Sequence, residues 1–195
     1  MIYDSAEDSY LIKKYIKYYS KNKKVLDIGT GSGILAKEAL KYTKKVSASD
    51  INEECLKNIK GIKTIESDLF ENIKEKYDLI IFNPPYLPLD NREDKESALS
   101  TSGGKKGHEL LEKFINELES HLNKNGKSLI VFSSLTKKRK IDSILKKNNF
   151  RFKLLEEKKL PFFETLYCYL ISWTSSSMHQ NIINVRSNKQ DYQIE

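Results

Sequence analysis

Short apolar runs alternate with segments of helical periodicity along most of this chain. Apolar residues recur three or four positions apart over residues 6–19, which predicts an amphipathic helix. Continuous apolar runs such as residues 77–82 are typical of buried strands. By the same criteria we expect the remaining elements: helices over residues 34–41, 53–58, 109–121 and 137–147, and strands over residues 25–28, 46–49, 63–65, 79–82, 128–132, 150–155 and 166–173.

The alternation of strands and helices predicts an α/β fold, with a mostly parallel sheet covered by helices on both faces. No helical pattern separates the last two strands, so we expect a hairpin joined through residues 161–163 and an antiparallel strand. At 195 residues the chain has the length of one compact unit, which we place at residues 1–173. Residues 174–195 are polar and aperiodic, and we expect a loose tail there.

A glycine-rich turn follows the first predicted strand. Its glycines, which include Gly29 and Gly31, fall as G-x-G-x-G rather than in the G-x-G-x-x-G spacing of dinucleotide sites. Glycine lets the backbone approach a ligand closely. Asp27, at the end of the strand, would repel a pyrophosphate and attract a cation. S-adenosylmethionine (SAM) carries a sulfonium and an ammonium and no phosphate, so the turn favours SAM as the ligand.

Two further acidic residues follow the next two predicted strands. Asp50 closes one of them and can accept hydrogen bonds from both ribose hydroxyls. Asp68 follows the other and could accept from the adenine amino group, with the backbone N–H of Leu69 donating to the ring. Each acid alone is more typical of a turn or a helix cap. Three acids at the ends of three successive strands, together with the glycine turn, favour SAM binding.

The segment Asn83-Pro84-Pro85-Tyr86 follows the apolar run of residues 77–82. Asn83 offers a side-chain carbonyl, and Pro84 offers a main-chain carbonyl on a stiff segment without an N–H. Tyr86 offers a ring face against which a planar group can stack. A simple turn after a strand is the alternative, since prolines mark such turns. Beside a SAM site, however, the segment is suited to holding a flat –NH2 group.

Together these motifs resemble those of the class I SAM-dependent methyltransferases, and specifically the HemK/PrmC family of protein-glutamine N5-methyltransferases. The opening Tyr3-Asp4-Ser5-Ala6-Glu7-Asp8-Ser9 is similar to the start of the short eukaryotic and archaeal branch, with Ser5 where that branch usually has proline. The stretch Gly103-Gly104-Lys105-Lys106-Gly107 resembles that branch too. The resemblance covers residues 1–173.

The resemblance implies a Rossmann-like sheet of seven strands in the order 3-2-1-4-5-7-6, with the last strand antiparallel. It implies a glutamine side chain in the Gly-Gly-Gln loop of a translation release factor as the methyl acceptor. It also implies a small zinc-ribbon activator protein on the exposed edge of the strand at residues 62–66. Asn83, Pro84, Pro85 and Tyr86 would bind the substrate amide, and three of them, Asn83, Pro84 and Tyr86, would be the catalytic residues. The implied cofactor contacts are Ser9, Asp27, Gly29, Gly31, Asp50, Asp68 and Leu69.

Two other functions stay open at this point. An adenine N6-methyltransferase also acts on a planar –NH2, but flipping a base out of a duplex needs a large basic surface. The formal charge of +7 comes mostly from lysine, and we interpret the basic run at residues 137–140 as a solvated face. A SAM-binding scaffold without activity is the second alternative, and the intact segment of residues 83–86 argues against it.

Other sequence features bear on metal binding, cellular location and a possible lid. Cys55 and Cys168 form no C-x-x-C pair and the three histidines have no metal spacing, so we predict no metal site. No apolar run approaches membrane-spanning length and the start of the chain is polar, so we expect a cytoplasmic protein. Residues 87–106 are long, charged and aperiodic, and we expect them to act as a substrate lid.

Overall fold

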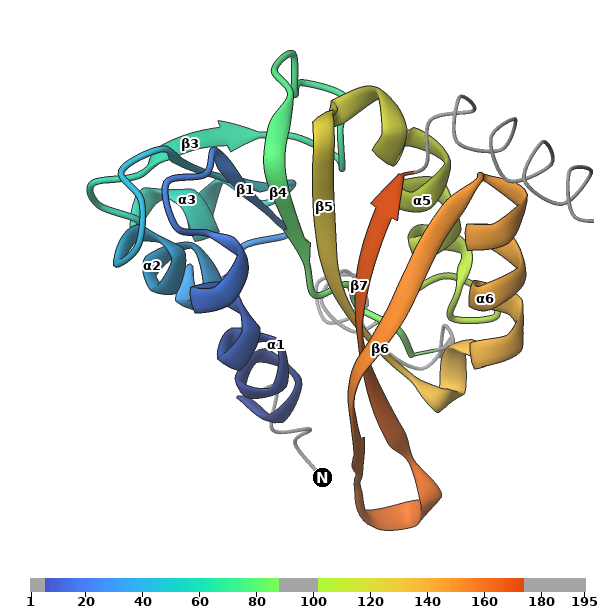
Figure 1. The fold of residues 1–195 in the computed structure, drawn as a ribbon. Helices are drawn as coiled ribbons and strands as arrows, with labels where there is room; N and C mark the ends of the chain where they lie inside the picture. Colours follow the sequence, from blue (N-terminus) through green and yellow to red (C-terminus); the bar gives the residue numbers. More distant parts are fainter. Residues whose placement is uncertain (1–5, 88–101, 174–195) are drawn as a thin grey trace, which may run out of the picture.

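The structure, a computed structural model, describes residues 6–87 and 102–173 and contains one seven-stranded sheet in the order β3-β2-β1-β4-β5-β7-β6 (Figure 1). The predicted strand order is therefore confirmed. The helices are α1 (Ala6–Tyr19), α2 (Ile34–Leu40), α3 (Glu53–Lys57), α5 (Glu109–His121) and α6 (Lys138–Lys147). The strands are β1 (Val25–Ile28), β2 (Val46–Asp50), β3 (Lys63–Glu66), β4 (Tyr77–Phe82), β5 (Leu122–Ser133), β6 (Phe150–Lys159) and β7 (Thr165–Trp173).

Five neighbouring strands of the sheet, β3 to β5, run parallel, and β7 runs antiparallel to both β5 and β6. Ile28, the last residue of β1, pairs with Ser49 of β2 and with Phe82 of β4. The carboxyl ends of these three central strands therefore meet at one edge of the sheet. Ligands of open α/β sheets bind at such an edge.

Side chains of the central strands alternate between two apolar layers. Leu79 and Ile81 of β4 pack in a core with residues of α1 and α2, whereas Ile80 and Phe82 pack in a second core with residues of α5 and α6. Figure 1 shows α1, α2 and α3 on one side of the sheet and α5 and α6 on the other. Because both faces are covered, the strands read as continuous apolar runs rather than as alternating ones.

Two strands extend well beyond the bounds that the sequence pattern predicts. β5 begins at Leu122, directly after α5, rather than at residue 128, because Leu122 already pairs with Tyr77 of β4. β6 runs to Lys159 rather than ending at residue 155, because it pairs with β7 as far as Thr165. Backbone pairing with a neighbouring strand thus extends these strands into polar segments whose sequence shows no strand pattern.

Several expectations fall on residues outside the described part of the chain. These are the start of the chain at residues 1–5, most of the expected lid at residues 88–101, and the expected loose tail at residues 174–195. The two ends of the lid segment are described and lie together, since Leu87 forms a β-bridge with Ser102. Within residues 6–87 and 102–173, no helix is both long and apolar enough to cross a bilayer.

Candidate active site

The glycine turn after β1 has an open face at Gly31. Its φ is +49°, a left-handed conformation that favours glycine, and no described heavy atom lies within 4 Å of the place where a Cβ would stand. The N–H of Gly31 donates to Oδ2 of Asp50 over 2.9 Å. The turn is therefore fixed to the end of β2 while one side of its backbone remains accessible to a ligand.

Asp27 is buried below this turn, with only 1% of its surface exposed. Its Oδ2 accepts hydrogen bonds from the Thr30 hydroxyl at 2.7 Å and from the Ala36 N–H at 2.9 Å. Its Oδ1 is buried and has no hydrogen-bond partner among the described residues. Burial raises the pKa of Asp27 to about 7, although these hydrogen bonds act in the opposite direction. A cationic group placed at Oδ1 would satisfy that oxygen and favour its charge.

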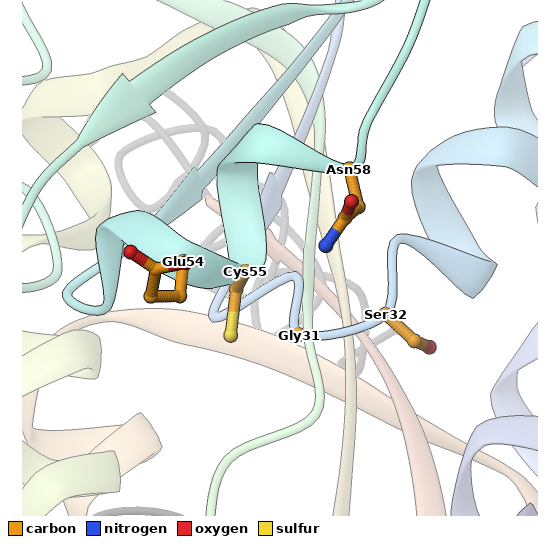
Figure 2. A pocket seen from close by; sticks show the side chains of 5 residues that line it. All are labelled: Gly31, Ser32, Glu54, Cys55 and Asn58. Carbon is orange, nitrogen blue, oxygen red and sulfur yellow. The ribbon is translucent and has the colours of Figure 1, made fainter.

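Asp50 closes β2, as expected, and both of its oxygens bind backbone. Oδ1 accepts from the N–H of Asn52, and Oδ2 accepts from Gly31, each over 2.9 Å. An open pocket of about 430 Å³ lies beside the turn and α3 (Figure 2). The residues that line it are Gly31, Ser32, Glu54, Cys55 and Asn58. Of the predicted cofactor residues only Gly31 is among them, and the sequence pattern did not point to the α3 side chains.

Asp68 and Leu69 lie in a turn beyond β3, which ends at Glu66. The Asp68 carboxylate is partly exposed and accepts a hydrogen bond from Nζ of Lys113, on α5, over 3.1 Å. Leu69 is buried and has a φ of +49°, which turns the chain sharply. Lys113 is a residue of this region that sequence reasoning missed, because a single lysine on a helix carries no local signal.

Asn83, Ser9, Asp8 and Tyr86 form a hydrogen-bonded group that joins the end of β4 to the start of α1. Nδ2 of Asn83 donates to the Ser9 hydroxyl over 3.1 Å, and the Tyr86 hydroxyl donates to Oδ2 of Asp8 over 3.2 Å. Oδ1 of Asp8 accepts from the Ser9 N–H over 2.5 Å. Oδ1 of Asn83 is buried and has no partner among the described residues. The carboxamide is thus held by its nitrogen, while its carbonyl oxygen is left as an acceptor.

Asp8 is the residue of this group that the sequence pattern failed to single out. It is only 6% exposed. Burial raises the pKa of Asp8, and hydrogen bonds from Ser9, Asn83 and Tyr86 offset part of that rise. The sequence contained Asp8 in the opening string that resembles the short branch, but gave it no role of its own. An acidic residue in the first turn of a helix usually reflects the helix dipole.

Tyr86 is placed differently from the open stacking surface that the sequence suggested. It is 4% exposed and packs in the core beneath α1 and α2, with its hydroxyl directed to Asp8. Gly103, near the end of the expected lid segment, supports the same segment from another side. A Cβ at Gly103 would lie 2.8 Å from the Pro85 carbonyl oxygen and 2.5 Å from that of Gly107, so glycine permits this close backbone packing.

Comparison with known proteins assigns this fold and site to a family. The family model described as Methyltransferase small domain matches residues 8–159. The chain belongs to this methyltransferase family. The match includes Asp8 and Ser9 of α1, the glycine turn and the segment of residues 83–86, so the methyltransferase domain contains every described residue of the site.

Curated relatives place this methyltransferase among the protein-glutamine N5-methyltransferases. A protein of Methanocaldococcus jannaschii, named provisionally as a protein N5-glutamine methyltransferase, is 40% identical over 176 residues, which are 85% of this chain and 89% of the relative. A release factor glutamine methyltransferase of Lactococcus lactis is 31% identical over 121 residues, which are 53% of this chain and 45% of that longer protein.

The fold of this methyltransferase is shared with solved structures. The complex of Mtq2 and Trm112 from E. cuniculi, described as responsible for methylation of the eRF1 translation termination factor, matches with a TM-score of 0.73. The identity is 23%, and the match covers 88% of this chain and 98% of the other. A ribosomal protein L11 methylase of Lactobacillus delbrueckii matches with a TM-score of 0.65 at 25% identity, over 89% and 81% of the two chains.

Proposed function

We propose that this protein transfers a methyl group from SAM to the side-chain amide nitrogen of a glutamine in the Gly-Gly-Gln loop of a translation release factor. The observation that carries the proposal is the state of Asn83. Its Nδ2 is occupied by Ser9, while its buried Oδ1 is left without a partner among the described residues. A buried acceptor without a donor is costly unless a ligand supplies one.

A primary amide can donate a hydrogen bond to this acceptor, and its nitrogen has to be oriented before it can react. The amide nitrogen is a poor nucleophile because its lone pair is delocalised into the carbonyl. Oδ1 of Asn83 and the carbonyl of Pro84 would accept the two N–H groups of the substrate and turn the lone pair toward the methyl donor. Positioning of this kind can lower a barrier by on the order of 7–11 kcal/mol at best.

The residues around the glycine turn fit SAM. Asp27 has a buried oxygen available for the ammonium group, and Gly31 leaves room for close approach of a ligand. Asp50 would accept from the ribose hydroxyls. Asp68 and Leu69 would hold the adenine, while the Asp68 carboxylate also accepts its hydrogen bond from Lys113. SAM, when bound, supplies an electrophilic methyl group on a sulfonium.

Asp8 and Ser9 would orient the residues that bind the substrate amide. Ser9 holds the Asn83 amide and would also touch the cofactor, while Asp8 fixes both Ser9 and Tyr86. Asp8 is therefore a positioning residue in this proposal, and Asn83 is the catalytic one.

The relatives' names support a release factor as the acceptor, and this part of the proposal is tested by labelled-methyl transfer. Purified release factor should be labelled on its Gly-Gly-Gln glutamine, while a variant with that glutamine replaced by alanine, duplex DNA and RNA should remain unlabelled. Label on adenine instead would establish the N6-methyltransferase alternative. Tight SAM binding without label on any of these acceptors would support a scaffold.

A small partner protein is the second part of the proposal. β3 is an edge strand of the sheet, and most of its residues are exposed. Such an edge can accept a strand from another protein. The E. cuniculi neighbour was solved as a complex with Trm112, which supports a small partner protein. We propose that this partner is a zinc-ribbon protein and that it docks on the β3 edge. Full activity and solubility of the chain alone would rule out an obligatory activator.

A further inference from the structure

The hairpin formed by β6 and β7 carries two exposed aromatic rings at its tip. The strands pair as far as Lys159 and Thr165, and a short 3-10 turn of Pro161–Phe163 joins them. Phe162 is 81% exposed and Phe163 is 103% exposed. Both have positive φ, +60° and +63°, which phenylalanine rarely adopts. The tip thus has two unfavourable local features, exposed aromatic rings and phenylalanines with positive φ. Such features concentrate at functional positions.

The tip lies at the edge of the sheet that carries the candidate active site. Leu166 of β7, just after the tip, pairs with Ser133, the last residue of β5. β5 in turn lies beside β4, whose last residue, Phe82, immediately precedes Asn83. Figure 1 shows the β6–β7 hairpin extending past the ends of the other strands, on the side where the start of α1 also lies.

Polar contacts connect the hairpin to the helix that carries the substrate-side group. Lys158 pairs with Glu7, the residue before Asp8. The Tyr15 hydroxyl donates to Glu156 over 2.9 Å, and Lys14 donates to the same carboxylate over 2.7 Å. These contacts set the position of the tip relative to Asp8 and Ser9, and through them relative to Asn83.

We propose that Phe162 and Phe163 form a docking point for the protein substrate, on an apolar surface of that protein beside its glutamine loop. This inference rests on the proposed function. Phenylalanine offers a large apolar area with few rotatable bonds, and such side chains dominate protein interfaces. Residues 156–165, around the tip, contain three glutamates and two lysines, and one of the lysines, Lys158, is paired with Glu7. The tip therefore has no excess of positive charge for a nucleic-acid backbone, which favours a polypeptide as the partner.

The test compares an intact protein substrate with a short peptide. A double variant, Phe162→Asn with Phe163→Asn, keeps a residue type that tolerates positive φ and removes both rings. Its KM for intact release factor should rise about ten- to a hundred-fold. Its kcat, its affinity for SAM and its kcat/KM for a short peptide containing Gly-Gly-Gln should stay at the level of the unaltered protein. Tyr18→Ser, 66% exposed at the far end of α1, is the control and should change none of these values.

The outcomes separate this inference from the proposed function. If the unaltered protein does not methylate release factor, the proposed function fails and the docking point fails with it. If it does, and the double variant has an unchanged KM for the intact protein, the docking point alone is wrong. An equal loss on the peptide and on the intact protein would also overturn it, because the tip would then act on the site rather than on docking.

Discussion

The carboxyl edge of the sheet contains two differently built halves. Around the glycine turn, carboxylates bind backbone N–H groups that are close in sequence, as Asp27 does with Ala36. Around Asn83, side chains bind side chains that are far apart, since Asn83 and Ser9 are 74 residues apart and Tyr86 and Asp8 are 78 apart. The first half is a backbone cradle suited to holding a cofactor, and the second is a side-chain network suited to orienting a reacting group.

This difference predicts that the two halves fail separately. Damage to the side-chain half should lower kcat and spare SAM affinity, because the network acts on the amide. Damage to the backbone half should weaken SAM binding first. Oδ1 of Asn83 and Oδ1 of Asp27 are each buried without a partner among the described residues. We expect Oδ1 of Asn83 to contact the substrate amide and Oδ1 of Asp27 to contact SAM.

The largest effect is expected for Asn83→Ala. Loss of the acceptor should lower kcat about 100- to 1,000-fold, the range seen when one group of a preorganised site is removed. The dissociation constant of SAM, measured by calorimetry, should change by less than about threefold. Asn116→Ala, on the exposed side of α5, is the control and should leave both values unchanged. Turnover near the level of the unaltered protein would remove Asn83 from the reaction.

Asp8→Asn should have the next largest effect. The variant can no longer accept from both Ser9 and Tyr86 as a charged group, so Asn83 loses its fixed orientation and kcat should fall about 10- to 100-fold. SAM affinity should be nearly unchanged. Tyr86→Phe removes only one of these hydrogen bonds and should cost less.

The pH profile tests the same residue in a second way. Because burial raises the pKa of Asp8, its ionised form is lost as the pH falls through a value above that of a free aspartate. The unaltered protein should therefore lose kcat on the acid side at a higher pH than a free aspartate would give. The Asp8→Asn variant should lack this limb. An identical acid limb in both proteins would assign the titration to another group.

Asp27 predicts a pH dependence of cofactor affinity. With its pKa near 7, the carboxyl group is increasingly protonated below pH 7 and attracts a cationic ligand less. SAM should bind about tenfold more weakly at pH 6 than at pH 8. The Asp27→Asn variant should bind weakly at both values and show a flat profile. An equal slope in both proteins would contradict a contact between Asp27 and the ammonium group.

The smallest effect is expected at Gly31, where the chain offers a matched control. Gly31 and Gly61 both have positive φ, and at neither does a described heavy atom lie within 4 Å of the place where a Cβ would stand. Replacement by alanine should therefore destabilise the fold similarly at each site, by about 1 kcal/mol. Only Gly31→Ala should also weaken SAM binding, by several-fold, because its methyl group would enter the ligand space. Equal SAM affinities would place the cofactor elsewhere.

Contiguous motifs allowed much of this protein to be predicted from sequence. The α/β class followed from alternating periodicities, and the glycine turn with Asp27 and Asp50 could be located because its residues are neighbours in the chain or end successive strands. Asn83 could be named because its segment is also continuous. The strand order came from the family resemblance, since periodicity reports whether a strand is buried and not which strand lies beside it.

Only the tertiary structure brought Asp8 to Tyr86, Ser9 to Asn83 and Lys113 to Asp68. Only the structure showed that the side-chain oxygen of Asn83 has no partner among the described residues. It also placed the exposed tip of the β6–β7 hairpin at the edge that carries the site. The reason is physical: local sequence determines how a segment folds and which face it buries. Contacts between side chains that are far apart in sequence depend on how the finished sheet and helices pack.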